Sequence, residues 1–339
     1  MASSYPPTDF VEPMCRPQTG LHTLTLPNPT RPGVWAAAVA QEASMWTKEE
    51  IHMGDDTLAD VTPEEARVVL GILSFFSTAD NIVMENINAN FASEITWSDV
   101  RYYLGFQLAI EGVHAAVYAA LLEQLVPDDA AREALVYSGG GNAVVSAAMR
   151  KKEWATKWMN ADRPLAERIV AFTLVEGLLF SAAFAFIAWL GHKYPGKRVL
   201  YGLVKSNEFI QRDENLHAVF HGQTLYGCLE RPAAPHTVRA IVEDAVATED
   251  NFVDTVFDDA LGMDKSAMKQ YVRLQADTIL QWLGNEALYK VENPFPWMSH
   301  MALNRQENFF EGIPAYTKVR VNEDAVFQAI DGSEDPLDF

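Results

Sequence analysis

The chain has 339 residues, 49% of them hydrophobic, which is enough to bury one large core or two ordinary ones. Its formal net charge of −20 would repel nucleic-acid phosphates and anionic lipid surfaces, so we expect neither a nucleic-acid partner nor a membrane. The two cysteines, Cys15 and Cys228, exclude a disulfide framework and have no zinc-like spacing, so we expect a reducing compartment, the cytoplasm.

From the N-terminus onward, capping and breaking signals predict mainly helices. Residues 1–30 are rich in Pro, Ser and Thr and lack the features of a secretory signal, so we expect a flexible segment. The sequence TPEE at 62–65 has the form of a capping box with proline at the first helical position, and predicts a helix to about residue 91. Comparable signals predict helices over 97–125, 127–138, 143–159, 164–191, 198–228, 235–259, 265–283 and 296–304.

Alternating, strand-like patterns are scarce throughout the chain. The predicted fold is therefore all-α, a bundle of long helices over residues 31–312. After this domain the sequence becomes polar and acidic, so we expect residues 313–339 to form a flexible tail. Such a tail could dock on a partner through its last residues, 336–339.

The segment IVAFTLVEGLLFSAAFAFIAWL at 169–190 is long and apolar enough to span a bilayer. Glu176 lies within it, and an ionised carboxylate would be costly in lipid. The alternative is a helix that is buried on all sides in a large soluble bundle. We favour the buried helix because no other segment looks like a membrane span.

Two Glu-x-x-His motifs carry the chemistry of this chain. They are Glu111-Gly112-Val113-His114 and Glu214-Asn215-Leu216-His217. Residues three apart share a face of a helix, so each motif directs a carboxylate and an imidazole toward one point. Oxygen and imidazole ligands together suit iron, manganese or zinc. One such motif would be weak evidence, but two within apolar helices favour a metal site.

Two further acidic residues, Glu176 and Asp80, stand alone in other apolar helices. Burying a carboxylate costs several kcal/mol unless it is paired or binds a metal. Four carboxylates and two histidines in such settings therefore predict two divalent metals. Ferritin-like di-metal carboxylate bundles bind their metals with this set of ligands. The alternative, separate salt bridges, is disfavoured because the neighbouring helical faces carry few basic residues.

Tyr118 lies one helical turn beyond His114 and so projects from the same face. A buried tyrosine usually packs and forms one hydrogen bond, but a phenol beside an oxygen-activating metal pair could be oxidised. Phe180, Phe184 and Ile210 are spaced along the helices of Glu176 and Glu214, and could form an apolar pocket that shields a radical. Ordinary core packing would give the same spacing.

At this point the sequence resembles the small subunits of class I ribonucleotide reductases, of the eukaryote-like type. The similarity runs in order from about Trp46 to Tyr316. It is carried by FFSTADNIVMEN (75–86), GFQLAIEGVHAAVY (105–118), VEGLLFSAAFAF (175–186), SNEFIQRDENLH (206–217), VENPFPWM (291–298) and ENFFE (307–311).

The resemblance implies a role for each matching residue. Asp80, Glu111 and His114 would hold one metal. Glu176, Glu214 and His217 would hold the other, with Glu111 and Glu214 as candidate bridges. Tyr118 would carry a stable radical.

It also implies a path by which the radical leaves the metal centre. Trp46 would pass the oxidising equivalent outward. Asp213 would link Trp46 to the metal-binding His114. Tyr316 would hand the equivalent to the partner subunit.

The resemblance further implies a homodimer whose tail docks on a separate large subunit. The two metals, iron most readily but also manganese or a mixed pair, would use dioxygen as the oxidant. The large subunit would reduce ribonucleotides to deoxyribonucleotides. Two alternatives remain at this point: another di-metal oxidase or hydroxylase component, and a ferritin-type storage protein.

Overall fold

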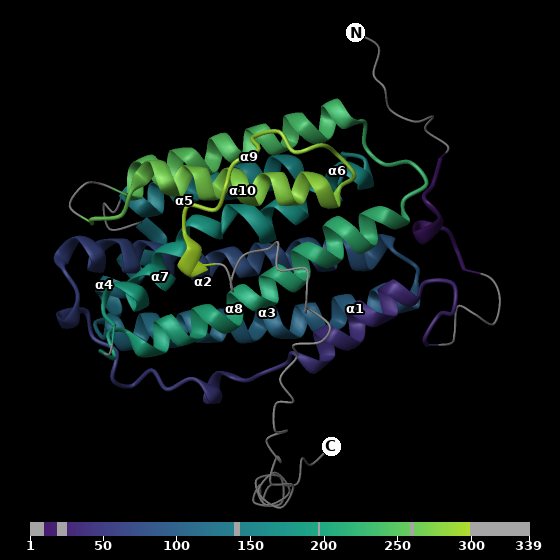
Figure 1. Ribbon diagram of the computed structural model, residues 1–339. Helices are drawn as coiled ribbons and strands as arrows, with labels where there is room; N and C mark the ends of the chain where they lie inside the picture. Colours follow the sequence, from purple (N-terminus) through teal and green to yellow (C-terminus); the bar gives the residue numbers. More distant parts are fainter. Residues whose placement is uncertain (1–9, 19–25, 139–142, 196, 258–260, 299–339) are drawn as a thin grey trace, which may run out of the picture. The chain divides into compact units, whose positions relative to one another are not determined.

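A computed structural model of the chain describes residues 10–18, 26–138, 143–195, 197–257 and 261–298, without the side chains of Thr78 and Asp80 (Figure 1). The described residues contain no strand, which confirms the all-α prediction. Their α-helices are α1 (Pro32–Ala43), α2 (Pro63–Asn86), α3 (Ser98–Leu125), α4 (Asp129–Ser138), α5 (Ala143–Trp158), α6 (Leu165–Leu174), α7 (Ser181–Lys193), α8 (Tyr201–Val219), α9 (Pro235–Val256) and α10 (Lys265–Trp282).

Side chains cap the first turns of α2 and α8. The Thr62 hydroxyl accepts a hydrogen bond from the N–H of Glu65, and the Glu65 carboxylate accepts one from the N–H of Thr62, which confirms the predicted capping box of α2. The cap of α8 comes from a distant loop, because the buried Asp56 carboxylate accepts from the N–H groups of Gly202 and Leu203. A Cβ at Gly202 would collide with the backbone of the same loop, so the close approach requires glycine.

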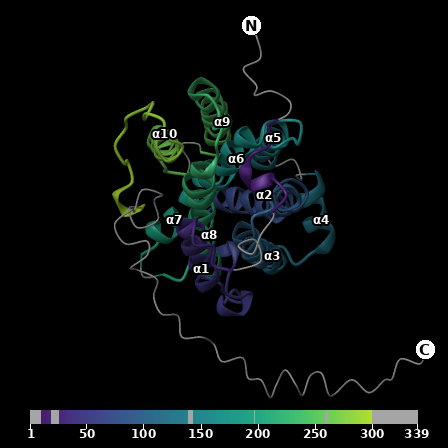
Figure 2. The same ribbon diagram turned by 90° about the vertical axis from the view of Figure 1, so that its right-hand side faces the viewer.

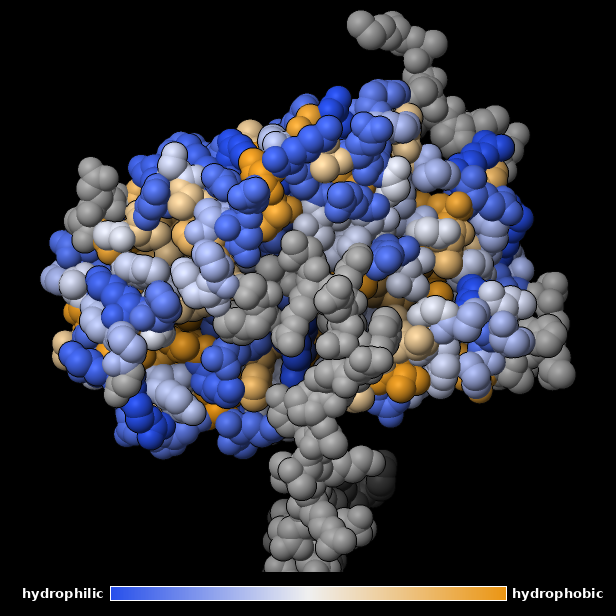
Figure 3. Space-filling model, viewed as in Figure 1, coloured by the Kyte–Doolittle hydropathy of each residue, from blue (hydrophilic) through white to orange (hydrophobic). Residues whose placement is uncertain are grey.

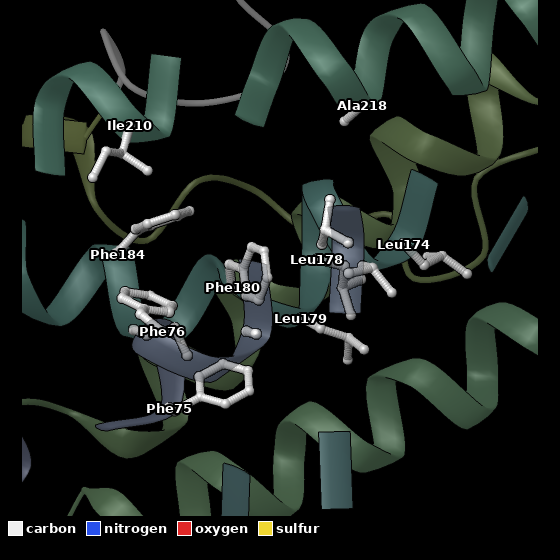
Figure 4. Packing of buried hydrophobic residues seen from close by; sticks show 14 of the residues in the cluster. Phe75, Phe76, Leu174, Leu178, Leu179, Phe180, Phe184, Ile210 and Ala218 are labelled. Atoms are coloured by element: carbon white, nitrogen blue, oxygen red, sulfur yellow. The ribbon is translucent and has the colours of Figure 1, made fainter. Parts of the chain in front are cut away.

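The helices pack in layers that can be followed in two views. In Figures 1 and 2, α9 and α10 lie uppermost, α1, α3 and α8 lie lowest, and α2 lies between them. α2 packs against α3 and α5, and α7 packs against α8. The apolar helix faces interdigitate to form one continuous core, part of which is shown in Figure 4.

The apolar helix expected over 164–191 is present, but it is not one regular helix. A π-helical segment, Val175–Leu179, separates α6 from α7, and it carries Glu176. The most apolar stretch of Leu165–Lys193 is entirely buried within the protein, as expected for the buried alternative. The face shown in Figure 3 is largely hydrophilic on its outer helices.

The expectation that no other segment could span a membrane was wrong. By length and composition, three described helices could cross a membrane, Pro63–Ala92, Ser98–Leu125 and Leu165–Lys193, whereas the sequence pattern indicated only the last. In the first of these, the π-helical segment Ile87–Ala92 extends α2, and in the third, the segment Val175–Leu179 joins α6 and α7 into one long apolar run.

The two ends of the predicted bundle are described in part. Near the N-terminus, Met14 is fully buried, and the Glu12 carboxylate accepts hydrogen bonds from the N–H groups of Glu230 and Arg231. At the other end, the helix expected over 296–304 is described only as a short 3-10 turn, Pro296–Met298. The rest of that helix and the whole tail lie outside the described residues, so the predicted boundaries of the three regions stay predictions.

Candidate metal centre

Three helical segments bring acidic and imidazole side chains to one buried point. Glu111 comes from α3, Glu176 from the π-helical segment, and Glu214 and His217 from α8. One possible ligand atom from each of these residues lies within 4.8 Å of the others, so the group could hold a metal ion. All four side chains are at most 2% exposed. Asp80 belongs to α2, but its side chain lies outside the described part of the chain, so its place at this site stays a prediction.

His114 joins this group from the same face of α3 as Glu111. Its Nδ1 lies 3.4 Å from Glu111 Oε2 and 3.1 Å from Glu214 Oε1. The Nδ1 of His217 lies 3.1 Å from Glu111 Oε1 and 3.1 Å from Glu214 Oε2. Each of these two carboxylates therefore turns one oxygen toward each imidazole, which is the arrangement expected of groups that bridge two sites.

The protonation of the cluster reflects its negative charge. Burial alone would lower the pKa of His114, but the neighbouring carboxylates of Asp213, Glu111 and Glu214 raise it well above its usual value. Burial likewise works to lower the pKa of His217, but Glu111 and Glu214 raise it to about 9. Burial works to raise the pKa of Glu214, and hydrogen bonds with the two imidazoles hold it well below its usual range.

The donor set fits divalent cations. Three carboxylates and two imidazoles offer the oxygen and nitrogen ligands that iron and manganese accept. Both oxygens of Glu111 and Nδ1 of His114 are fully buried, close to polar atoms, yet without a well-aligned hydrogen bond. A buried polar atom left in this state requires an explanation, and a bound cation supplies one.

A hydrogen-bonded connection leads from His114 to Trp46. His114 Nε2 lies 3.2 Å from Asp213 Oδ2, and Trp46 Nε1 donates to the same oxygen at 2.6 Å. The other oxygen, Oδ1, accepts from the guanidinium of Arg212 at 2.8 Å. We call His114, Asp213 and Trp46 the polar chain; its members are at most 4% exposed. The family resemblance placed these three residues together, but it did not point to Arg212. The position of Arg212 next to Asp213 in the sequence could have indicated this contact.

Tyr118 has aromatic neighbours. It is 3% exposed, and its ring centroid lies 4.8 Å from that of Phe76. The Phe76 ring in turn contacts Phe180 at 5.5 Å and Phe184 at 5.2 Å. Figure 4 shows Ile210 of α8 facing Phe184 across this region. We call Phe76, Phe180 and Phe184 the aromatic group; Phe76, the member that contacts Tyr118, was not predicted from the sequence.

Gln107 is a further residue of the site that sequence reasoning missed. Its Nε2 donates to Glu176 Oε1 at 3.1 Å, and its Oε1 lies 2.9 Å from His221 Nε2. Burial holds the pKa of His221 well below its usual value, so the neutral ring donates to Gln107. Gln107 lies one helical turn before Glu111 on the same face of α3, and a polar residue in that apolar stripe was the available signal. Tyr316, the remaining predicted site residue, lies outside the described residues.

The chain is similar to known proteins over most of its length. The family model described as "Ribonucleotide reductase, small chain" matches residues 24–294. A ribonucleoside-diphosphate reductase small chain from Arabidopsis thaliana is 38% identical over 284 residues, which cover 83% of each protein. The small subunit from Dictyostelium discoideum is 36% identical over 297 residues, 86% of this chain and 85% of its own. The structure of the ribonucleotide reductase Rnr4 homodimer from Saccharomyces cerevisiae matches with a TM-score of 0.74 at 26% identity, over 84% of this chain and 88% of the yeast protein.

Proposed function

The chain belongs to the ribonucleotide reductase small-chain family and is a small subunit of ribonucleoside-diphosphate reductase, and from that premise we propose that it generates the radical for the enzyme. The observation that carries the proposal is the convergence of three carboxylates and two imidazoles at one buried point. Such a group of charges is stable only with protons or cations to balance it.

The proposed centre would hold two metals. Asp80, Glu111 and His114 would hold one, and Glu176, Glu214 and His217 would hold the other. Glu111 and Glu214 are the candidate bridges, which is supported by the way each faces both imidazoles. When bound, two iron ions, two manganese ions or a mixed pair would supply the electrons that activate dioxygen.

Tyr118 is the proposed site of the stable radical. Its phenol would give up one electron and one proton to the oxidant that the bound metals and dioxygen supply, and the aromatic group would exclude water from it. Phe180, Phe184 and Ile210 serve as the apolar lining. Their burial supports this role, since each is at most 3% exposed.

The polar chain is the proposed exit route for the oxidising equivalent. Trp46 and Asp213 carry it away from His114, and Tyr316 in the tail passes it to the large subunit. The hydrogen bonds of 2.6 Å and 3.2 Å at Asp213 support the first step. They also fix the orientation of the His114 ring, as outer partners of metal-binding histidines commonly do.

The remaining proposals concern assembly. We propose that the chain forms a homodimer, as the yeast relative does by its description. Its tail, residues 313–339, would dock on the large subunit, which reduces ribonucleotides to deoxyribonucleotides. The complex would work in the cytoplasm.

Electron paramagnetic resonance tests the proposed radical. The chain is reconstituted with iron or manganese and dioxygen, and we expect a tyrosyl signal that Tyr118→Phe abolishes while metal content stays near two per chain. Tyr103→Phe is the matched control, because Tyr103 is a second buried phenol on α3. A tyrosyl signal that persists in Tyr118→Phe would refute the assignment, and a signal lost in Tyr103→Phe alone would transfer it to that residue.

A further inference from the structure

The helix that carries Glu176 is broken at the end of its π-helical segment. Such segments interrupt the regular pattern of backbone hydrogen bonds, and they occur frequently at functional sites. Here the Leu178 carbonyl accepts from the Ser181 hydroxyl at 2.7 Å. The Leu179 carbonyl and the N–H of Ala182, on either side of the break, bond to side chains from other helices.

Those side chains are Lys151 of α5 and Glu249 of α9. Lys151 Nζ donates to the Leu179 carbonyl at 2.6 Å, and Glu249 Oε1 accepts from the N–H of Ala182 at 3.2 Å. The two side chains also pair with each other, with 2.7 Å between Nζ and Oε2. Both are at most 1% exposed, and α5 and α9 pack directly against each other.

Stability alone is a poor explanation for this ion pair. Burying two charges costs several kcal/mol per ion, and well-packed apolar residues often serve a core equally well or better. The ammonium does gain from the Phe252 ring, whose centroid lies 3.5 Å away. The contacts that an apolar pair could not replace are the two backbone bonds at the break.

We propose that the Lys151–Glu249 ion pair is a positioning device that fixes the π-helical segment, and thereby Glu176, for metal binding. This inference rests on the proposed function, because it assumes that Glu176 is a metal ligand. Lys151 and Glu249 belong to neither Glu-x-x-His motif and act on the metal centre through the backbone. Their role is therefore distinct from that of Gln107, which touches the Glu176 carboxylate directly.

The test measures the affinity of manganese(II) alone for the full-length protein, by competition with a chelator under anaerobic conditions. Lys151→Met keeps most of the side-chain volume but removes the donor, and Glu249→Leu removes the acceptor. We expect each to weaken manganese binding by about ten- to hundredfold, the usual cost of losing an outer partner of a ligand. Glu249→Gln keeps the shape and one acceptor, and we expect a smaller but measurable loss.

Arg273→Met is the matched control. It breaks a partly buried ion pair with Asp250, which is the neighbour of Glu249 on α9. We expect this change to lower stability without changing manganese affinity. The spectrum of bound manganese(II) is a second readout, which we expect to change with Lys151→Met and not with the control.

The outcomes separate the two proposals. If folded Lys151→Met binds manganese as the wild type does, with an unchanged spectrum, the positioning role is overturned and the pair is only structural. If Lys151→Met does not fold, the manganese affinity and spectrum of Glu249→Leu decide in its place. If Glu249→Leu does not fold either, those of Glu249→Gln decide. If the wild type itself binds neither manganese nor iron, the proposed metal centre fails and this inference falls with it.

Discussion

The polar chain begins at His114 of the carboxylate–imidazole cluster, and the aromatic group contacts Tyr118, one turn further along α3, but the two are built from opposite kinds of contact. In the polar chain, atoms that can donate or accept protons lie 2.6 to 3.2 Å apart from Trp46 through Asp213 to His114. In the aromatic group, ring centroids lie 5.2 to 5.5 Å apart around Phe76, and Tyr118 packs on the same ring.

This difference matches two opposite requirements of a radical-generating protein. A stored radical survives where water is excluded and side reactions are prevented. An exported oxidising equivalent needs groups that are held in contact and can adjust their hydrogen bonds as charge moves. Under the proposed function, one metal centre would serve both storage and export of the radical, because each process has surroundings of its own kind.

Breaking the polar chain should give the largest effect. In Trp46→Phe the indole N–H that donates to Asp213 is lost. We expect reductase activity to fall by about a hundredfold, because phenylalanine neither donates to Asp213 nor is oxidised as readily as tryptophan, while metal content and the tyrosyl signal persist. Nucleotide reduction with the large subunit is the measurement.

Trp158→Phe is the control for this variant. It removes an indole–carboxylate hydrogen bond of the same kind, 2.7 Å from Trp158 Nε1 to Asp244 Oδ2, between α5 and α9. We expect its activity to stay close to that of the wild type. Full activity in Trp46→Phe would remove Trp46 from the route.

Opening the aromatic group should shorten the life of the radical rather than prevent its transfer. Phe76→Ala leaves a cavity against the Tyr118 ring, which costs about 3–5 kcal/mol of stability and admits water. Phe257→Ala is the control, since it removes an equally buried ring that packs on Phe186. We expect similar losses of stability but faster decay of the tyrosyl signal only in Phe76→Ala. Equal decay rates would contradict the shielding role.

Much of the fold could be predicted because its signals are local. The capping box at Thr62 and the apolar periodicity of α2 and α3 depend on residues within a few turns. The π-helical segment at Val175–Leu179 could not be predicted in this way. Its broken backbone bonds are satisfied by Lys151 and Glu249, which are distant in sequence, so the local pattern there reads as one uninterrupted apolar helix.

The site was predictable to the extent that its residues repeat a spacing. Two Glu-x-x-His motifs located Glu111, His114, Glu214 and His217, all of which the structure brings together. Gln107 was not located, because a single glutamine has no pattern of its own and acquires a role only through Glu176 on another helix. Asp80 and Tyr316 stay predictions, since the structure does not describe the side chain of either.

The Lys151–Glu249 ion pair lies close to Phe75, whose ring contacts Phe180 of the aromatic group, so this region is not wholly apolar. Lys151 Nζ lies 5.5 Å from the centre of the Phe75 ring, and its partner Glu249 is fully buried. Burial raises the pKa of Glu249 from 4.5 to about 7, against the attraction of Lys151. The folded state therefore holds this proton more tightly than the unfolded chain does.

The sign of the pH dependence follows from that raised pKa. At Glu249 the folded state binds more protons than the unfolded state between pH 4.5 and about 7, so the contribution of this group to stability falls as the pH rises through this range. Glu249→Gln has no such proton. We expect the free energy of unfolding of the metal-free wild type, minus that of the variant, to fall by on the order of 1–3 kcal/mol over this range and then level off. Urea unfolding at each pH measures it. Lys151→Met removes the attraction that lowers the pKa of Glu249, so in this background the fall in the free-energy difference should extend to higher pH. If the difference in unfolding free energy between wild type and Glu249→Gln does not vary with pH, Glu249 keeps its charge throughout.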